Sequence, residues 1–205
     1  MFRRLIILAG IAALACALAA PALAVRVKVR VEGKTTTIFG AAQPTLTTGP
    51  NALAVLDAAS VAGEFYYHVQ ATSFGTYVDQ IGRYAAAGQT GWVFKVNGKS
   101  PPVGADAVKL QEGDTVLWYW AQFGVAGGPK TLALERAGTQ KNCYRVYAED
   151  DNGTRTAAVG SALHVGAHRT VLTQGATQGA VGCVGPHTGL VRATLAGAVR
   201  SNALP

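Results

Sequence analysis

The sequence predicts an α+β domain, built as a mixed sheet with one helix, followed by a small all-β, sandwich-like domain. Three observations carry this prediction: strict apolar–polar alternation early in the chain, one segment with helical spacing, and short strand-like segments separated by glycine in the second half. The composition permits a packed core, since 49% of the 205 residues are hydrophobic and only 14% are charged. Disorder driven by charge is thereby excluded.

The first 24 residues are predicted to be a cleaved secretory signal peptide. Basic residues at positions 3 and 4 precede an apolar run over residues 5–20, and Ala22 and Ala24 supply the small residues of a cleavage site. The run is shorter than the roughly 20 residues that a membrane-spanning helix needs. Lipidation at Cys16 is the alternative. We therefore expect a mature chain outside the cytoplasm, without an integral membrane segment.

The first predicted domain covers residues 25–124 and begins with a strand. Residues 25–31 alternate Val with Arg or Lys, which is typical of a half-buried strand with one apolar and one basic face. We interpret the basic face, Arg26, Lys28 and Arg30, as charge that protects an exposed sheet edge from pairing. Binding of an acidic polymer or anionic lipid by these residues is the alternative.

One helix and further strands follow. Helical spacing of Leu and Val predicts a helix from Asn51, its N-cap, to about residue 62, ended by Gly63. Residues 74–87 are interpreted as a glycine-punctuated connection. Alternation predicts strands at residues 35–39, 65–70, 92–96 and 115–123. One helix on one face of a mixed sheet is an α+β arrangement.

The second predicted domain, residues 131–205, follows a glycine-rich linker over residues 125–130. Its predicted strands, separated by glycine, suggest a small β-sandwich and cover residues 143–148, 162–165, 168–173, 180–184 and 189–194. Cys143 and Cys183 remain after signal cleavage, and an even pair in an oxidising compartment predicts a disulfide. In the chain-entropy model such a bridge, closing about 40 residues, is worth roughly 4 kcal/mol.

Aromatic residues gather on two predicted neighbouring strands. Those that share a face with other apolar residues are interpreted as a structural core: Trp92, Phe94, Trp118 and Trp120. The opposite face of strand 115–123 presents Leu117 and Tyr119, where a sheet with one solvated face should be polar. We expect these two residues either to dock the second domain or to bind a ligand or partner, with Tyr66 and His68 as neighbours.

Signals for catalysis and for metal binding are weak. The sequence has no Gly-x-Ser-x-Gly elbow and no phosphate-binding loop, so we expect no enzyme activity. His164 and His168 are four residues apart, but Gly166 between them indicates a hairpin rather than a zinc-binding helix. Residues 150–153, Asp-Asp-Asn-Gly, are interpreted as a hairpin turn, because a calcium loop needs further spaced ligands. No metal and no nucleic-acid partner are assigned.

Four segments of the first domain form a recognisable succession. Residues 54–59 form part of a helix, and residues 74–82 read Phe-Gly-Thr-Tyr-Val-Asp-Gln-Ile-Gly. Residues 91–98 run from Gly-Trp into an Asn-Gly turn, and residues 103–119 contain a Val-Gly-Ala step and a Gly-Asp-Thr-Val-Leu-Trp strand. This succession resembles the family of the C-terminal domain of transcobalamin and intrinsic factor, over about residues 26–123. The resemblance implies a β-grasp-like domain used for extracytoplasmic ligand binding or surface display.

The tail resembles a different group. Residues 163–205 are similar to the transthyretin-like or carboxypeptidase-regulatory-like sandwiches appended to bacterial surface proteins, and residues 189–194 fit their late strand. This resemblance implies a surface-associated sandwich and names no ligand.

Together these observations predict a secreted or cell-envelope, non-catalytic binding protein. Its expected partner is a small-molecule, glycan or protein ligand at the cell surface. In the vitamin carriers a large α-helical barrel covers the other side of the corrinoid, and this chain has no room for one. The resemblance alone makes cobalamin a possible ligand, and the lack of room for that barrel argues against it. No cofactor is assigned. A purely structural cell-envelope module that mediates protein–protein contacts is the alternative.

Overall fold

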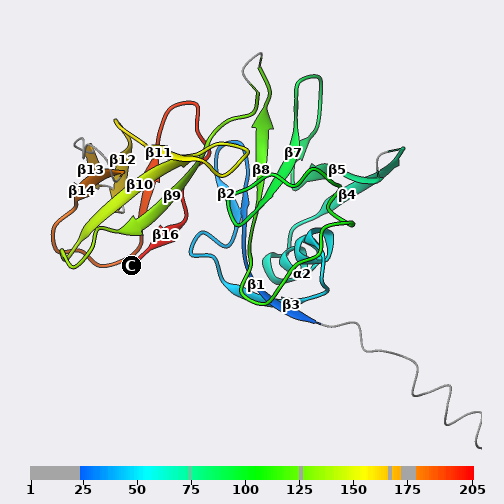
Figure 1. The fold of residues 1–205 in the computed structure, drawn as a ribbon, viewed down its shortest axis with the longest axis horizontal. Coiled ribbons are helices and arrows are strands. Elements are labelled where there is room, and N and C mark those ends of the chain that lie inside the picture. The colour runs from blue at the N-terminus through cyan, green and yellow to red at the C-terminus, as the bar shows by residue number, and fades with distance from the viewer. Residues whose placement is uncertain (1–23, 74, 125–126, 166–167, 172–178) are drawn as a thin grey trace, which may run out of the picture.

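The computed structural model describes residues 24–73, 75–124, 127–165, 168–171 and 179–205. The predicted signal peptide with Cys16, and the first two residues of the predicted linker, lie outside these described residues. We call residues 24–124 the N-terminal region and residues 127–205 the C-terminal region. In Figure 1 the C-terminal region lies beside the large sheet of the N-terminal region. The division of the chain into these two domains stays a prediction.

A five-stranded sheet forms the centre of the N-terminal region. Its strands are β1 (Val25–Glu32), β2 (Thr37–Phe39), β3 (Thr45–Thr48), β7 (Thr90–Val96) and β8 (Thr115–Gln122). The order is β2-β1-β8-β7, with β3 also pairing with β1. The β1–β8 pair is parallel and the other pairs are antiparallel, so the sheet is mixed as predicted.

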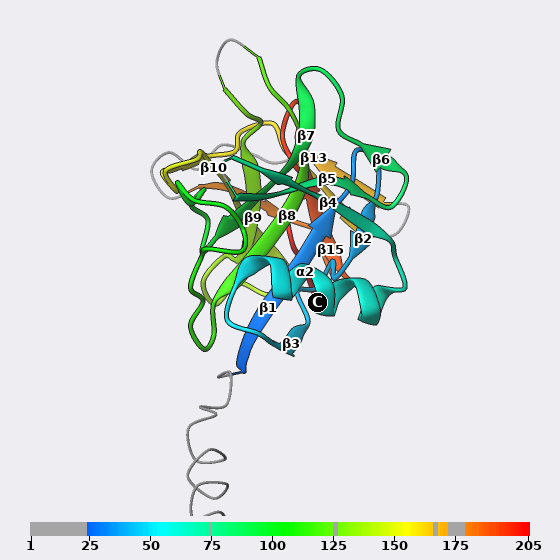
Figure 2. The same cartoon turned by 90° about the vertical axis from the view of Figure 1, so that its right-hand side faces the viewer.

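The helix α2 (Ala52–Gly63) packs on one face of this sheet, as Figure 2 shows. Its N-cap is Asn51, whose side chain accepts a hydrogen bond from the Ala54 backbone at 2.8 Å. At the other end Glu64 takes the left-handed conformation, with φ of 51°. Gly63 is the last helical residue, and the position requires glycine because a Cβ there would lie 2.6 Å from the Phe39 ring. A mostly β structure with a single described helix therefore agrees with the coarse fold prediction.

A separate three-stranded sheet joins α2 to β7. It comprises β4 (Tyr67–Thr72), β5 (Gly75–Ile81) and β6 (Tyr84–Ala85), in that order. The interpretation of residues 74–87 as a connection was wrong, because β5 and β6 occupy most of that segment. Residues 75–81 have no clean alternation of apolar and polar side chains, so their pattern did not reveal the strand.

The C-terminal region contains two four-stranded sheets. One joins β9 (Thr131–Arg136), β10 (Cys143–Glu149), β11 (Arg155–Ala157) and β14 (Ala180–Cys183). The other has the order β13 (His168–Val171), β12 (Ala162–Val165), β15 (Val191–Thr194) and β16 (Ala203–Leu204). Strands β9 and β16 were not predicted, whereas β12 has the predicted bounds. Buried side chains from both sheets form one hydrophobic cluster.

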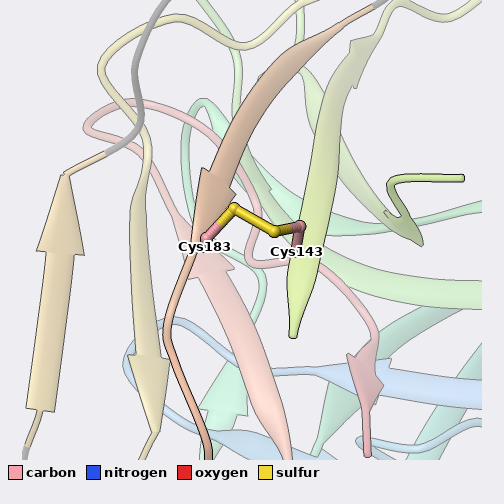
Figure 3. The surroundings of a disulfide bond; sticks show 2 residues. All are labelled: Cys143 and Cys183. Atoms are coloured by element: carbon pink, nitrogen blue, oxygen red, sulfur yellow. A yellow bond between two sulfur atoms is a disulfide. The ribbon is translucent and has the colours of Figure 1, made fainter. Parts of the chain in front are cut away.

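The predicted disulfide between Cys143 and Cys183 is confirmed. The two cysteines lie directly opposite each other on the paired strands β10 and β14 (Figure 3). The bridge therefore joins neighbouring strands of the first of the two C-terminal sheets, across a sequence separation of 40.

Strand β1 lies in the interior of its sheet, so the prediction of a charge-protected edge was wrong. It pairs with β2 and β3 on one side and with β8 on the other. Arg26 and Lys28 are exposed, but Arg30 is only 3% exposed. The basic face is therefore partly buried, against elements that are distant in the sequence.

In the part of the chain that the structure describes, no helix combines the length and apolarity needed to cross a membrane.

Candidate functional site

The C-terminal region covers the face of the five-stranded sheet that lies opposite α2. Leu117, Tyr119 and Ala121 of β8 are buried in one cluster with Val199 of the C-terminal region, and Val93 of β7 packs against it. Of the two roles expected for Leu117 and Tyr119, the structure therefore shows contact with the second region. Leu117 is 6% exposed and Tyr119 is 1% exposed, so both side chains are buried in this contact.

A fully buried carboxylate lies in this interface. Glu32 of β1 is 0% exposed and accepts hydrogen bonds from the guanidinium groups of Arg192 and Arg200, the latter at 3.0 Å. Arg30 donates to the same carboxylate at 3.4 Å and to the Arg200 main-chain oxygen at 2.6 Å. Burial lowers the pKa of Arg30 to about 10, although Glu32 opposes the shift. A buried carboxylate thus holds three arginines from two distant parts of the chain.

A second buried charge fixes the neighbouring turn. Lys95 is 1% exposed, and its Nζ donates to the main-chain oxygens of Glu149 at 3.1 Å and Asp150 at 2.7 Å. It also donates to Thr131 Oγ1 at 3.1 Å. Burial lowers the pKa of Lys95, and the nearby acidic groups oppose this. These bonds hold the 150–153 turn against the N-terminal region, where Ser100 N–H donates to the Asp151 main-chain oxygen at 2.8 Å.

Tyr66 and His68 are not neighbours of Leu117 and Tyr119. His68 lies on β4 in the three-stranded sheet, and its Nδ1 lies 2.7 Å from an Asp79 carboxylate oxygen. Tyr66 precedes β4 and is 59% exposed. The expected grouping of four residues was therefore wrong, because β4 pairs with β5 rather than with the five-stranded sheet.

The four predicted core aromatics lie on the α2 side of the sheet. Trp92 and Trp118 are buried in the N-terminal cluster, and Phe94 and Trp120 pack against it. The Trp92 and Trp120 rings meet edge to face with centroids 5.6 Å apart. Trp118 Nε1 donates to the Ala52 main-chain oxygen at 3.3 Å, which ties β8 to the start of α2.

An aromatic groove lies beside β7, at the junction of the two regions. A pocket of about 300 Å³ is lined by Thr76, Tyr77, Val78, Trp92, Val93, Phe94, Ser100, Pro101, Gly104, Ala105, Trp118, Tyr119, Phe123 and Asp151. A second hollow of about 780 Å³ shares Thr76, Tyr77, Pro101 and Gly104 with it, so the two form one groove. Mostly apolar walls with a few polar groups are typical of small-ligand sites.

The walls of this groove are held by hydrogen bonds between elements. Thr76 of β5 donates through Oγ1 to Asp106 at 2.7 Å, which joins β5 to the loop at residues 100–107. Ser100 Oγ donates to an Asp151 carboxylate oxygen at 3.1 Å. Burial raises the pKa of Tyr77, and its interaction with the Trp92 backbone opposes this rise. The groove is therefore built from β5, β7, β8 and the loop at residues 100–107 of the N-terminal region, together with one turn of the C-terminal region.

Sequence reasoning missed most of this groove. It identified Tyr119 and the core aromatics, but not Tyr77, Phe123 or Asp151. Tyr77 and Phe123 are respectively 38% and 39% exposed. The sequence signal for Tyr77 was its place in residues 74–82, one of the segments that resemble the transcobalamin C-terminal family. Among the described residues, no three His, Cys, Asp or Glu side chains gather as potential metal ligands.

Comparison with known proteins gives a match to a family model and similarity to solved structures. Residues 49–122, which include α2, the three-stranded sheet, β7 and β8, match the model of a domain of unknown function, DUF4430. No curated protein matches the chain significantly. A solved structure from Ruminococcus gnavus, described as a "putative metal binding protein", is similar with 13% identity and a TM-score of 0.36. That similarity covers 48% of this chain and 97% of the other. The family match thus covers most of the residues that line the groove.

Proposed function

We propose that this protein is an extracytoplasmic, non-catalytic binding protein, and that its ligand occupies the groove beside β7. The observation that carries the proposal is the gathering of Tyr77, Trp92, Phe94 and Phe123 around one pocket of about 300 Å³. Aromatic walls of this kind provide large apolar contact areas and faces on which a flat or ring-shaped ligand stacks. The ligand is a small molecule, a glycan or a segment of a protein that presents an apolar face.

The sequence resemblance supports the same class of function. The match to DUF4430 covers residues 49–122, inside the segment that resembles the transcobalamin C-terminal family. One helix on a mixed sheet suits the β-grasp-like fold that this resemblance implies. The Cys143–Cys183 disulfide supports an oxidising compartment, in keeping with the signal-peptide pattern of the first 24 residues.

A thermal-shift experiment tests this proposal. The oxidised protein is incubated with cobalamin, with other corrinoids and with cell-wall glycan fragments, and its unfolding temperature is measured. A ligand that binds the folded state raises that temperature. We expect Tyr77→Ala, which removes an aromatic wall, to abolish the shift.

Tyr66→Ala provides the matched control. Tyr66 is an exposed tyrosine of the same region but does not line the groove. We expect this variant to keep the full shift. Absence of a shift with every probe, or equal loss in both variants, would contradict binding in the groove and favour a structural cell-envelope module.

A further inference from the structure

The hydrogen-bonding pattern of β7 defines which backbone groups face the groove. At one end of the β7–β8 pair Asn97 N–H donates to Thr115 at 2.9 Å, and at the other Phe123 N–H donates to Gln89 at 2.8 Å. In an antiparallel pair, alternate residues direct both backbone groups toward the neighbouring strand. The register therefore directs residues 91, 93 and 95 toward β8. Residues 90, 92, 94 and 96 direct their N–H and C=O groups to the free edge of β7.

Both ends of this free edge are already paired. Thr90 exchanges hydrogen bonds with Ala87, at 3.0 and 3.1 Å. Val96 exchanges hydrogen bonds with Lys99, at 2.8 and 3.0 Å. Between them, the Tyr77 hydroxyl lies against this part of the edge, since a Cβ on Gly91 would come within 2.5 Å of it. Among the described strands β7 pairs with β8 alone, so no strand pairs with the N–H and C=O of Phe94.

The unpaired groups of Phe94 lie where the groove lies. The groove is lined by Trp92, Phe94 and Trp118 from one face of the sheet. Val93 and Tyr119 line it from the other face. A single pocket can contact both faces only beyond the edge of the sheet, and β7 is the edge strand. Backbone groups in an apolar setting are normally paired, since leaving them without a partner costs stability. Phe94 therefore offers one donor and one acceptor to an incoming ligand.

We propose that the groove takes a short extended peptide segment, one residue of which pairs with Phe94 as an added β-strand. This inference rests on the proposed binding function of the groove. In an extended peptide, the N–H and C=O of one residue point to the same side, and they match the two groups of Phe94. In a single trans amide, such as the acetamido group of a sugar, the N–H and C=O point in opposite directions and take only one of the two bonds. The geometry thus favours a peptide over an N-acetylated glycan.

The blocked ends limit the length of the added strand. Tyr77 occupies the edge at Trp92, and Lys99 occupies it at Val96, four residues further along. At about 3.3 Å per residue this interval spans roughly 13 Å. A slot of that length accommodates about three peptide residues. The apolar walls of the pocket favour a large apolar side chain next to the paired residue.

Two blocked tripeptides test the pairing on the full-length oxidised protein. The first is acetyl-Ala-Leu-Ala-amide, and the second is its ester analogue, in which an oxygen replaces the Leu N–H. We expect the amide peptide to bind and the ester to bind about tenfold more weakly, because it lacks one hydrogen-bond donor. By NMR hydrogen exchange, the Phe94 amide should exchange faster than those of Val93 and Lys95 in the free protein, and should become protected with the amide peptide.

A pair of variants isolates the backbone donor of the protein. Phe94→Ala keeps the N–H, whereas Phe94→Pro removes it at an edge position whose N–H faces away from β8. We expect Phe94→Ala to keep measurable peptide affinity and Phe94→Pro to lose it, with folding of both checked by tryptophan fluorescence. Should Phe94→Pro not fold, the ester comparison and the exchange measurement decide the matter alone.

The outcomes separate this inference from the proposed function. Equal affinity for the amide and ester peptides, or a Phe94 amide that is already protected in the free protein, overturns strand addition. If no peptide binds while a corrinoid or glycan gives a shift that depends on Tyr77, the proposed function stands and the peptide inference fails. If nothing binds in either experiment, both fail.

Discussion

The two regions of the molecule have cores of different composition. The N-terminal cluster contains Trp92 and Trp118, with Phe39, Phe65 and Phe94 among the residues packed against it. The C-terminal cluster has a single aromatic residue, Tyr144, and four alanines. Large side chains bury more apolar area each, so the first core is stabilised mainly by packing. The second has less apolar area to bury and gains stability from a disulfide and from its contact with the first region.

This contrast indicates that the interface is part of the structure of the C-terminal region. Arg192 and Arg200 form ion pairs with the buried Glu32, Lys95 forms one with Asp151, and an apolar contact joins Val199 to Leu117 and Tyr119. All three tryptophans lie in the N-terminal region, so tryptophan fluorescence reports on that region, whereas circular dichroism reports on both. The two signals together show whether one region unfolds without the other.

The largest effect is expected from Glu32→Ala. Removing the carboxylate leaves three arginines without their shared partner, and breaking a buried ion pair in this way costs about 3–5 kcal/mol. We expect the free energy of unfolding, measured in denaturant, to fall by that amount. The matched control is Glu112→Ala, whose ion pair with Arg26 is exposed. That change should cost less than about 1 kcal/mol, and similar losses in both variants would contradict the role assigned to Glu32.

Loss of the disulfide is expected to destabilise the C-terminal region first. The double variant Cys143→Ser with Cys183→Ser removes a cross-link worth about 2–4 kcal/mol. During heating, the circular dichroism signal should then change at a lower temperature than tryptophan fluorescence. A single transition shared by both signals would instead show that the interface couples the two regions completely.

A smaller effect is expected at the start of α2. Asn51→Ala removes the side chain that accepts a hydrogen bond from Ala54, and loss of an N-cap costs about 1 kcal/mol. Asn51→Asp keeps an acceptor oxygen and should restore most of the stability. Denaturant unfolding followed by tryptophan fluorescence measures both variants. An equal loss in the Asp variant would argue against capping as the cause.

The smallest change in stability is expected with Tyr119→Phe. The difference between this variant and the parent that tests the burial of the hydroxyl is expected only at alkaline pH. Burial raises the pKa of Tyr119 above its ordinary value. Above a pH of about 10 the unfolded chain therefore loses this proton while the folded protein retains it, so stability falls as the pH rises. The lowered pKa of Lys95 makes stability rise with pH in that range, but this effect is the same in the variant and in the parent. Between pH 9 and pH 11 the free energy of unfolding should fall less in the variant than in the parent. The difference should be the free energy that corresponds to about one pH unit of tyrosine ionisation. Parallel pH profiles would contradict the burial of the hydroxyl.

Local sequence patterns predicted where strands lie, but they did not predict which parts of the chain pack against those strands. The alternation in residues 25–31 correctly gives a strand with a buried valine face, because period-two patterning is a property of the segment itself. The other face was misinterpreted because the partners of Arg30 and Glu32 lie about 160 residues away, on Arg192 and Arg200. Alternation shows which side chains share a face, but not what covers that face.

The site was predicted only in part for the same reason. Leu117 and Tyr119 are apolar residues on a face that should be polar, and this local anomaly correctly indicates a contact. Their assumed neighbours, Tyr66 and His68, were wrong because the sequence does not show that β4 belongs to a different sheet. The groove depends on Tyr77 and on Asp151, which only the tertiary structure brings together.

The face of the five-stranded sheet opposite α2 carries both charged and apolar side chains, and this mixture has a consequence for the chain before it is completely folded. Synthesis proceeds from the N-terminus, so Glu32 emerges well before Arg192 and Arg200, and the contact between Glu32 and Arg200 spans 168 residues. Until the later part of the chain folds, the face that carries Leu117 and Tyr119 is open to water. Arg30, Glu32 and Lys95 lie on the same face, and as solvated charges they disfavour association with other chains at that stage. The charges that join the two regions in the finished molecule thus oppose association with other chains whenever the C-terminal region is not docked on this face.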